Sequence, residues 1–460
     1  MEKLVFNETL IQKYNIGAPR YTSYPTAALF RSIEISDYIE FVHESNAQVL
    51  PGPLSFYIHI PFCSTICYYC ACTKIVTKDK SHAVKYVDHL VREFEIKASL
   101  YDKDREVVQL HFGGGTPTFL NNEQFSKIFA SLNSHYHLSE LDNRDFSIEI
   151  DPRTVNGFRL EALRQLGFNR LSFGVQDTNR IVQQAVNRIQ ANAKTEELVH
   201  AARGLGFKSI NIDLIYGLPF QTVESFLETI NRIIDLRPDR LSIFNYAHLP
   251  SRFKPQRRID QKTLPSASQK FEIYHRAIRS LDEAGYRLIG MDHFALPEDD
   301  LCLAQDEKLL QRNFQGYSTH LDCDLVSFGI SAISALDECY VQNVVDLQKY
   351  YDSLERGYLP LLQGIILTED DRIRRAVIMQ LMCHFHVSKN NIAQRFNIEF
   401  DSYFSSEILR LMQVQKDGLL LVDTKEITVT AIGRLMVRAI CMIFDRYHVL
   451  TDDVRYSKII

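Results

Sequence analysis

The chain has 460 residues, of which 45% are hydrophobic and 24% are charged, as is usual for a soluble globular protein. Its formal net charge is −5, and this small acidic balance argues against non-specific binding to nucleic acid or to an anionic membrane. No apolar run approaches the roughly 18 residues of a membrane span, and the first residues lack the apolar core of a signal peptide. We therefore expect a cytoplasmic protein with neither a nucleic-acid nor a membrane partner.

Residues 1–53 are predicted to form an irregular N-terminal arm. The arm contains the run PRYTSYPT at residues 19–26, whose prolines disfavour a helix and favour extended chain. Because aromatic side chains in an extended segment must pack on something, we expect the arm to lie over the main body of the protein, across the substrate site.

Residues 54–365 repeat a short apolar strand, a loop and an amphipathic helix. The predicted strands are 55–60, 107–112, 146–150, 170–175, 209–215 and 240–246, and a seventh is possible at 286–290. The predicted helices between them are 83–100, 124–132, 160–166, 195–205 and 223–236. Strands that alternate with helices indicate parallel βα units. Six near-continuously apolar strands predict an α/β fold, a partial (β/α)6 barrel of the TIM type.

The unusual residues of this region follow the predicted strands directly. Cysteines follow the first strand, Gly113–Gly115 follow the second, and Glu149 and Asp151 stand at the end of the third. Because active sites of βα barrels gather at the carboxyl ends of the strands, these residues predict the position of the site.

Residues 366–460 are predicted to form a mainly helical C-terminal domain. Thr368 and the acids after it resemble a helix N-cap and first turn. The helix they begin runs through Met382, and helices at 388–396 and 404–415, a hairpin at 419–430 and a helix at 431–444 follow, an order that resembles a winged helix. Because its charge is near neutral, whereas groove-reading domains carry a basic stripe, we expect a lid or packing role.

Four of the nine cysteines lie within ten residues. Cys63, Cys67 and Cys70 have the spacing C-x3-C-x2-C, and Cys72 follows. Structural zinc sites usually pair two separated knuckles, and neither a second knuckle nor a histidine at ligand spacing follows here. An iron–sulfur cluster is therefore the favoured interpretation. The other five cysteines are scattered among hydrophobic neighbours and are expected to be small buried hydrophobes.

The number of ligands decides what the cluster can do. Four thiolates would close it and suit it to electron transfer, whereas three would leave one iron open to a substrate or cofactor. Cys70 and Cys72 are one residue apart, so in an extended chain their side chains point in opposite directions. This favours ligation by Cys63, Cys67 and Cys70. Cys72 is then either a packed thiol or a group close to the reacting centre.

The cysteine spacing after the first strand of a βα barrel resembles the radical S-adenosylmethionine (SAM) superfamily. Further motifs narrow the resemblance to the oxygen-independent coproporphyrinogen III oxidases (dehydrogenases), and they extend from the arm to residue 317. They are PRYTSYPT (19–26), YIHIPFC (57–63), HFGGGTPT (111–118), SIEIDPR (147–153), GVQD (174–177), NIDLIYGLP (211–219), FNYAHLP (244–250), GMDHFA (290–295) and RNFQGY (312–317).

The resemblance implies a [4Fe-4S] cluster, two molecules of SAM and a low-potential electron donor such as a flavodoxin. It implies that a SAM-derived 5′-deoxyadenosyl radical removes hydrogen from two propionates of coproporphyrinogen III. Loss of carbon dioxide and an electron then gives the vinyl groups of protoporphyrinogen IX, a step of anaerobic haem biosynthesis. A monomer is expected.

The resemblance also implies roles for individual residues. The cofactor site next to the cluster is assigned to Tyr57, Gly114, Glu149 and Ile333. A second SAM site is assigned to Tyr69, Gly115, Thr116, Gln176, Arg188, Asp213 and Ala247, and cofactor contacts are also assigned to Phe314 and Gln315. Outside this context, Glu149 and Asp213 could be ordinary carboxylates at strand ends.

Catalytic roles are predicted for Tyr57, His59 and Cys72, although a histidine within an apolar strand is usually a satisfied core residue. His59 is two residues from Tyr57 on the same strand face, which favours an orientation toward the cofactor. The substrate carries four carboxylates and needs cations. Arg20, with Tyr21 and Tyr24, is one predicted substrate contact, and the basic cluster at 252–258 is another candidate that is more often a solvated loop.

Two other functions remain possible at this point. A related haem chaperone would share the triple-cysteine loop, but chaperones of that group generally lack PRYTSYPT, the fourth cysteine and RNFQGY, all of which are present. A winged-helix regulator with a redox-sensing cluster is disfavoured by the near-neutral C-terminal domain.

Overall fold

The computed structural model describes residues 6–320, 322–448 and 456–459. It divides into two compact units. The barrel unit comprises Phe30–Pro265 and Asp322–Ile366, and the second unit comprises Met1–Leu29, Ser266–Leu321 and Leu367–Ile460. Among the described residues, no helix is both long and apolar enough to cross a membrane. The predicted domain boundaries after residues 53 and 365 stay a prediction.

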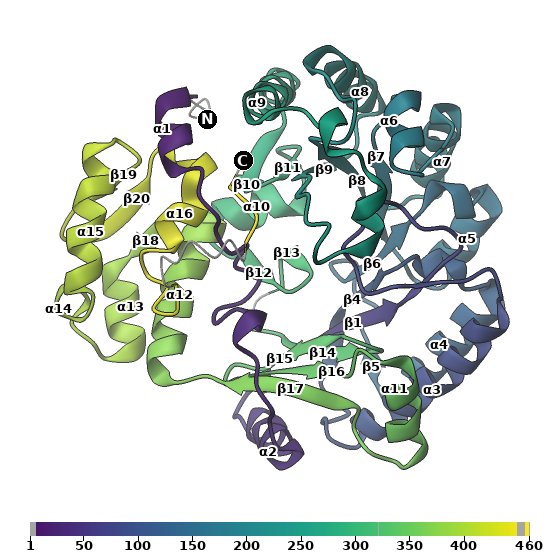
Figure 1. Ribbon diagram of the computed structural model, residues 1–460. Helices are drawn as coiled ribbons and strands as arrows, with labels where there is room; N and C mark the ends of the chain where they lie inside the picture. Colours follow the sequence, from purple (N-terminus) through teal and green to yellow (C-terminus); the bar gives the residue numbers. More distant parts are fainter. Residues whose placement is uncertain (1–5, 321, 449–455, 460) are drawn as a thin grey trace. The chain divides into compact units, whose positions relative to one another are not determined.

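A parallel sheet forms the centre of the barrel unit. Its strands are β1 (Leu54–Ile60), β4 (Glu106–Gly114), β6 (Asp145–Ile150), β7 (Arg170–Gln176), β8 (Ser209–Tyr216), β9 (Arg240–Asn245) and β14 (Asp324–Phe328). They are ordered β14-β1-β4-β6-β7-β8-β9. From β1 to β9 each parallel strand therefore lies next to the one that follows it in the chain, as in an open barrel (Figure 1). The predicted α/β fold with a partial (β/α)6 barrel is confirmed.

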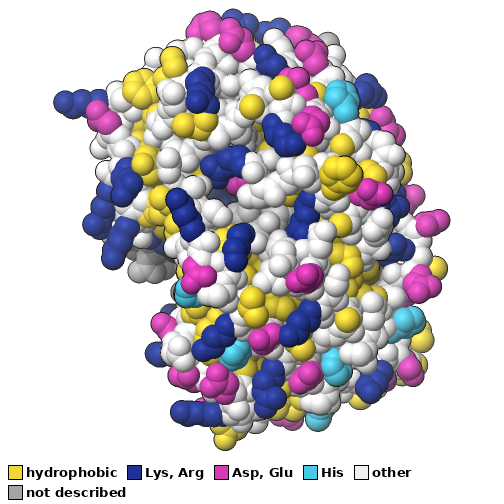
Figure 2. All heavy atoms as spheres, turned by 90° about the vertical axis from the view of Figure 1, so that its right-hand side faces the viewer, with side chains coloured by type: hydrophobic (Ala, Val, Ile, Leu, Met, Phe, Trp, Pro, Cys, Tyr) yellow, Lys and Arg dark blue, Asp and Glu magenta, His cyan; other side chains and the backbone are white. Residues whose placement is uncertain are grey.

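Helices connect the parallel strands and cover the sheet. They are α3 (Ser81–Ala98), α4 (Asn122–His135), α5 (Gly157–Gln165), α6 (Arg180–Ala185), α7 (Asn192–Gly204) and α8 (Val223–Leu236). Side chains of Asn121 and Thr222 cap α4 and α8 in complete capping boxes, so these helices begin where their loops leave the carboxyl ends of the strands. The face over α4, α5 and α7 carries basic and acidic side chains interspersed (Figure 2).

Short antiparallel strands extend the sheet beyond β14 and were not predicted. They are β15 (Ile333–Ala335), β16 (Cys339–Asn343) and β17 (Leu361–Ile366), with α11 (Leu347–Glu355) before the last. The unit also contains the two-residue strands β2 (Phe62–Cys63), β3 (Ile75–Val76) and β5 (His137–Leu138).

The prediction that residues 1–53 are irregular is wrong for two segments. Helix α1 spans Glu8–Tyr14 and α2 spans Ile35–Asn46. Helix α2 buries Tyr38 and Val42 at helical spacing. Two buried residues among polar ones give a weak helical pattern in the sequence, and tertiary packing stabilises the helix.

The second unit contains the remaining elements. They are α1, α9 (Ala267–Glu283), β10 (Arg287–Gly290), β11 (His293–Ala295), α10 (Asp300–Asp306), β12 (Gln311–Asn313), β13 (Gly316–Ser318), α12 (Glu369–His384), β18 (His386–Ser388), α13 (Lys389–Phe396), α14 (Phe400–Tyr403), α15 (Ser405–Lys416), β19 (Leu420–Val422), β20 (Glu426–Val429) and α16 (Val437–Cys441). The predicted seventh strand corresponds to β10, which pairs with β11 in an antiparallel hairpin.

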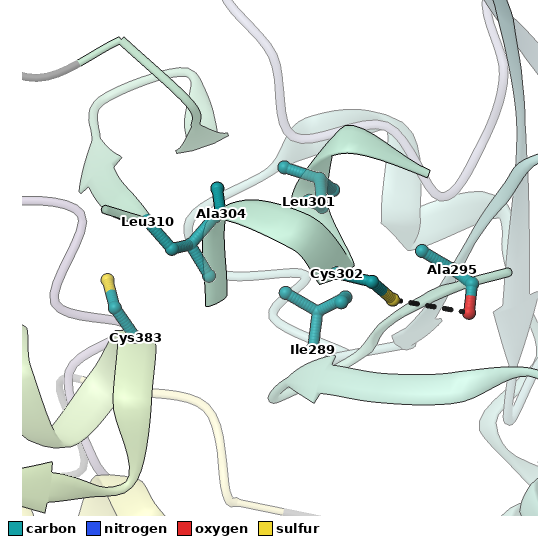
Figure 3. Packing of buried hydrophobic residues seen from close by; sticks show 7 residues of the cluster. All are labelled: Ile289, Ala295, Leu301, Cys302, Ala304, Leu310 and Cys383. Atoms are coloured by element: carbon teal, nitrogen blue, oxygen red, sulfur yellow. Dashed lines mark hydrogen bonds between the residues drawn. The ribbon is translucent and has the colours of Figure 1, made fainter. Parts of the chain in front are cut away.

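One core cluster of the second unit packs Ile289 of β10 and Ala295 of β11 against α10, Leu310 and Cys383 (Figure 3). Cys302 and Cys383 lie in it, and the thiol of Cys302 is 3.8 Å from the carbonyl of Ala295. Cys339 and Cys441 are also buried, whereas Cys323 is half-buried. The expectation of buried hydrophobic thiols is thus confirmed for four of the five scattered cysteines.

The C-terminal residues form helices beside a small wing. Strands β18, β20 and β19 make a three-stranded antiparallel sheet in that order, which agrees with a winged-helix-like arrangement. The last predicted helix, 431–444, is wrong in extent, because the chain forms a 3-10 turn at Gly433–Met436 and then only the short α16. Gly433 lies against the backbone of Leu419, which favours a tight turn at that point.

The barrel unit contains a fully buried ion pair. Glu93 and Lys97 lie 2.7 Å apart with both side chains 0% exposed. Glu93 also accepts hydrogen bonds from Gly329 N, Asn343 and Tyr350.

We expect Glu93→Ala to destabilise the protein by about 3–5 kcal/mol, because it leaves the charge of Lys97 buried without a partner. The free energy of unfolding in denaturant measures this. Glu95→Ala, an exposed position on the same helix, is the control and should change it by less than about 0.5 kcal/mol. Equal stability of both variants would contradict a structural role for the pair.

Candidate functional site

The cysteine loop follows β1 directly at the carboxyl edge of the sheet. Parallel pairing of β2 with β3, with Cys63 opposite Val76, closes the loop at its base. All four thiols are free; Cys63 and Cys67 are buried, Cys70 is half-buried and Cys72 is exposed. The loop therefore presents four thiols from a short, folded segment.

Polar groups from three other loops approach the thiols. The hydroxyl of Thr116 donates to the sulfur of Cys63 at 3.4 Å. Arg188 Nη1 and Arg153 Nη2 lie 3.6 and 3.8 Å from the sulfur of Cys67. Burial raises the pKa of Cys63 to about 11, while the hydrogen bond from Thr116 opposes that shift and favours the thiolate, the form that binds metal.

Cys70 and Cys72 do not point apart as an extended chain would require. A hydrogen bond from the thiol of Cys72, followed by the charge of Lys74, lowers the pKa of Cys70 to about 6 despite its burial. The Lys74 ammonium group also donates to the carbonyls of both cysteines. The prediction that the side chains of Cys70 and Cys72 point in opposite directions is therefore wrong, because the loop bends there. The choice of the first three cysteines as ligands stays a prediction.

This donor set fits a [4Fe-4S] cluster better than a single metal ion. Within residues 6–320, 322–448 and 456–459, no group of three His, Cys, Asp or Glu side chains could hold one metal ion. A cluster binds each thiolate through a different iron, so its ligands need not converge on one point. Thiols that are free, close in sequence and next to cationic groups meet that requirement.

Tyr57 and His59 project from the same face of β1. The Tyr57 hydroxyl lies 3.0 Å from His59 Nδ1, and His59 Nε2 lies 3.1 Å from the carbonyl of Thr73. A carbonyl can only accept, so Nε2 carries the proton and Nδ1 accepts from the tyrosine. Burial lowers the pKa of His59 and raises that of Tyr57, so both side chains are neutral at pH 7.

Gly114 lies against this pair and next to Glu149. Gly114 has φ +115°, and a Cβ atom there would stand 2.6 Å from the imidazole of His59. Its N–H donates to Glu149 Oε2 at 3.2 Å, while the Glu149 side chain remains 45% exposed. A carboxylate is thus held at the carboxyl ends of β4 and β6 and faces solvent.

We expect Gly114→Ala to reduce activity strongly, because the left-handed backbone and the imidazole both oppose a Cβ atom. Gly157→Ala is a matched control, since nothing lies within 4 Å of a Cβ atom at that position. Rates of SAM cleavage in both variants, compared at equal iron content, measure the effect. Wild-type rates for Gly114→Ala would show that this close approach is unimportant.

Arg188 joins three parts of the site. It donates to Asp151 at 3.2 Å and to the carbonyl of Gly174 at 2.6 Å, in addition to its contact with Cys67. Burial by itself would raise the pKa of Asp151, but the charge of Arg188 and hydrogen bonds from Arg153 outweigh it and keep that pKa below its usual value. The acid is therefore ionised and forms a buried ion pair.

Asp213 is held by neutral donors. The Ser172 hydroxyl and the Asn211 amide each donate to it at 2.8 Å, and Ser242 lies 3.3 Å from the Asn211 oxygen. Burial raises the pKa of Asp213. Asp213 is therefore held at the strand ends by a network of neutral polar groups from β7, β8 and β9.

The other predicted residues of the barrel unit also lie at strand ends or in the cysteine loop. Gly115 donates its N–H to the carbonyl of Ile60, and Gln176 ends β7 with φ +71°. The side-chain amide of Gln256 donates hydrogen bonds to the carbonyls of Tyr69 and Ala247. Ile333 opens β15, opposite Gln342.

Five predicted residues belong to the second unit. Phe314 and Gln315 form the tip of the β12–β13 hairpin, where Gln315 N donates to Asn313. Tyr21 and Tyr24 are buried, bonded to Asp445 and to Arg446 N, so their side chains have little surface for a ligand. Arg20 pairs with Asp292 at 2.6 Å and keeps 37% exposure.

Two residues of the site could not be predicted from the sequence. The ring of His111 stacks on Tyr57 at 5.9 Å, with Nδ1 2.8 Å from the Ser147 hydroxyl. Arg153 touches Cys67, as described above. The pairing of Tyr57 with His111 across β1 and β4 depends on strand register, which the sequence pattern does not contain.

Family models match two parts of the chain. Residues 57–233 match the radical SAM superfamily model, which spans the cysteine loop and the strands that surround it. Residues 367–436 match the HemN C-terminal domain, which covers helices α12 to α15 and the wing strands β18, β19 and β20.

Complete relatives are similar over nearly the whole chain. An oxygen-independent coproporphyrinogen III oxidase of Pseudomonas aeruginosa is 49% identical, with 100% of both chains covered. One from Escherichia coli is 47% identical over 97% of this chain and 96% of its own. A solved structure of coproporphyrinogen III oxidase from Escherichia coli, described as a radical SAM enzyme, has a TM-score of 0.92 at 46% identity and covers 97% of this chain and 100% of its own. The chain therefore belongs to the family of oxygen-independent coproporphyrinogen III oxidases, within the radical SAM superfamily.

Proposed function

We propose that this protein converts coproporphyrinogen III to protoporphyrinogen IX by oxidative decarboxylation of two propionates. The observation that carries the proposal is the set of three thiols at the carboxyl end of β1, in a chain about half identical to such oxidases over its full length. No comparison favours the haem chaperone.

The chain's own residues would hold the cofactors. Cys63, Cys67 and Cys70 would bind a [4Fe-4S] cluster, and Thr116 and Arg188 would donate to its sulfur ligands. When bound, the cluster and SAM supply a 5′-deoxyadenosyl radical that abstracts hydrogen from a propionate. The exposed carboxylate of Glu149 suits an ammonium or ribose donor of SAM.

Tyr57 and His59 would shape the pocket beside Glu149. Because both are neutral, they add no charge next to a sulfonium cofactor, and the fixed tautomer of His59 makes Tyr57 the donor of their hydrogen bond. We assign His59 as a residue that orients Tyr57, and Cys72, exposed and next to Cys70, as a group near the reacting centre.

A second SAM site would involve Asp213 and Arg188. The other residues proposed for it lie at strand ends or in the cysteine loop, and they are Tyr69, Gly115, Thr116, Gln176 and Ala247. Phe314 and Gln315 are proposed as further cofactor contacts from the β12–β13 hairpin, and Ile333 as a wall of the first site.

The substrate's carboxylates require cations. Arg20 keeps exposed surface while paired with Asp292 and is the proposed contact. Tyr21 and Tyr24 would act by anchoring the arm, since their hydroxyls already bond within the second unit. We further propose a cytoplasmic monomer that receives electrons from a low-potential donor such as a flavodoxin.

An anaerobic assay tests the proposed function. The reconstituted protein receives dithionite, SAM and coproporphyrinogen III, and protoporphyrinogen IX, carbon dioxide and 5′-deoxyadenosine are measured. We expect substrate-dependent formation of all three. Binding of haem without any decarboxylation would favour the chaperone instead.

A further inference from the structure

A pocket of about 640 Å³ opens on the barrel unit next to the cysteine loop. Its lining residues come from three stretches, 80–84, 118–124 and 153–159. Each stretch includes the start of a helix, α3, α4 or α5. The pocket therefore lies on the side of the unit where the strands end and the cysteines stand.

The pocket is positively charged. Lys80, Arg153 and Arg159 line it, and no Asp or Glu belongs to its lining within the described part of the chain. Arg153 is paired with Asp151 outside the lining, so Lys80 and Arg159 are the cations that a ligand would meet. Burial and the neighbouring charge of Arg159 lower the pKa of Lys80, as expected where cations crowd together. The amides of Asn121 and Gln124 add neutral donors. The lining therefore suits carboxylates or other anions.

One side chain joins this pocket to a predicted cluster ligand. Arg153 lines the pocket with its side chain 24% exposed. Its Nη2 atom lies 3.8 Å from the sulfur of Cys67. A molecule seated in the pocket would therefore be separated from the cluster by little more than this guanidinium group.

Two apolar side chains in or beside the lining stretches are exposed to solvent. Phe158 lies in the first turn of α5, between lining residues Asn156 and Arg159, and is 83% exposed. Val84 lines the pocket and is 54% exposed. An exposed aromatic residue beside arginine is a common composition at protein interfaces. A small anion would not need these apolar groups, whereas a protein surface would use them.

We infer that this pocket is the docking surface for the electron donor, an acidic protein that carries a low-potential one-electron centre. The inference rests on the proposed function, because only a cluster that must be reduced needs such a partner. In the transfer the donor loses one electron and the cluster gains it, and no covalent bond forms or breaks. Carboxylates of the donor meet Lys80 and Arg159, and an apolar residue meets Phe158.

A contact of this kind should be transient and steered by charge. Electron-transfer encounters bury less than about 1,200 Å², which suits one pocket with a few anchors. Opposite charges raise association rates by about 10- to 1,000-fold and the gain falls with ionic strength, so cluster reduction by the donor should slow as salt increases.

Stopped-flow reduction of the cluster tests this, with photoreduced flavodoxin as the probe and dithionite as a small reductant that needs no docking surface. The variants are Lys80→Glu and Phe158→Ala. Lys103→Glu is the matched control, because Lys103 is exposed and precedes β4, at the opposite ends of the strands from the cysteines.

We expect flavodoxin to reduce Lys80→Glu at least about 10-fold more slowly, with a weaker salt dependence, and Phe158→Ala several-fold more slowly. Reduction by dithionite should be unchanged, as should every rate of Lys103→Glu. Wild-type flavodoxin rates in both pocket variants would overturn the inference. So would a raised KM for coproporphyrinogen III in Lys80→Glu with dithionite, which would assign the pocket to substrate carboxylates. Failure of wild-type protein to cleave SAM with dithionite would instead count against the proposed function.

Discussion

Replacement of Cys63, Cys67 or Cys70 by alanine is expected to remove bound iron and abolish SAM cleavage, whereas Cys72→Ala should keep the cluster. Each of the first three thiols would bind a different iron, so each replacement removes one of only three protein ligands of the cluster. Cys72 is exposed and is predicted not to be a ligand, so its removal should leave the iron in place and affect turnover alone.

Iron and sulfide content, visible absorbance and 5′-deoxyadenosine formation measure this series. Cys302→Ala, which removes a buried thiol of the second unit, controls for a general effect of losing a cysteine and should retain iron. Loss of iron in Cys72→Ala to the same degree as in the other three would identify a fourth ligand. It would also leave no iron open to SAM.

The second large effect is expected for Arg188→Met. This change removes one of the two guanidinium groups paired with Asp151, while Arg153 stays at 2.7 Å. Loss of one hydrogen bond to a buried charge should cost about 1.5–3 kcal/mol of stability. The pKa of Asp151 is depressed by the pair, so the pair stabilises the protein above about pH 4 and the contribution is lost as the pH falls through the folded-state pKa. The difference between Arg188→Met and wild type should therefore be large at pH 7 and shrink toward acid.

Adding Asp151→Asn to Arg188→Met separates stability from cofactor binding. The double variant removes the carboxylate as well, but Arg153 then loses its ion pair with that carboxylate. Its free energy of unfolding at pH 7 should therefore recover only part of the loss. SAM binding should stay weak, because Arg188 is also proposed to contact the cofactor. Full recovery of SAM binding would make Arg188 a purely structural residue, and no recovery of stability would contradict the ion-pair explanation.

The repeating units of the barrel could be predicted because each strand is near-continuously apolar and each helix is amphipathic. Strand β8 and helix α8 agree with their predicted ranges to within one residue. Short elements could not be predicted in the same way. Strand β15 has three residues, too few to show an alternation of hydrophobic and polar side chains. Strand β14 pairs with β1 on the side opposite β4, and this long-range pairing leaves no local signal in the sequence.

The site shows the same limit. The cysteine spacing and the residues at strand ends predict where chemistry is located, since parallel strands end at one edge. They do not predict side-chain partners. His111 stacks on Tyr57 because the two strands pair in one register, and Arg153 reaches Cys67 from a loop far along the chain. The bend that brings Cys72 to Cys70 likewise depends on tertiary packing.

Mössbauer spectroscopy of the reconstituted cluster, with and without SAM, tests the central claim most directly. If three thiolates hold the [4Fe-4S] cluster, one iron differs from the rest, and SAM should change the signal of that iron alone. A spectrum that SAM leaves unaltered, from irons that are all bound by protein sulfur, would contradict the account.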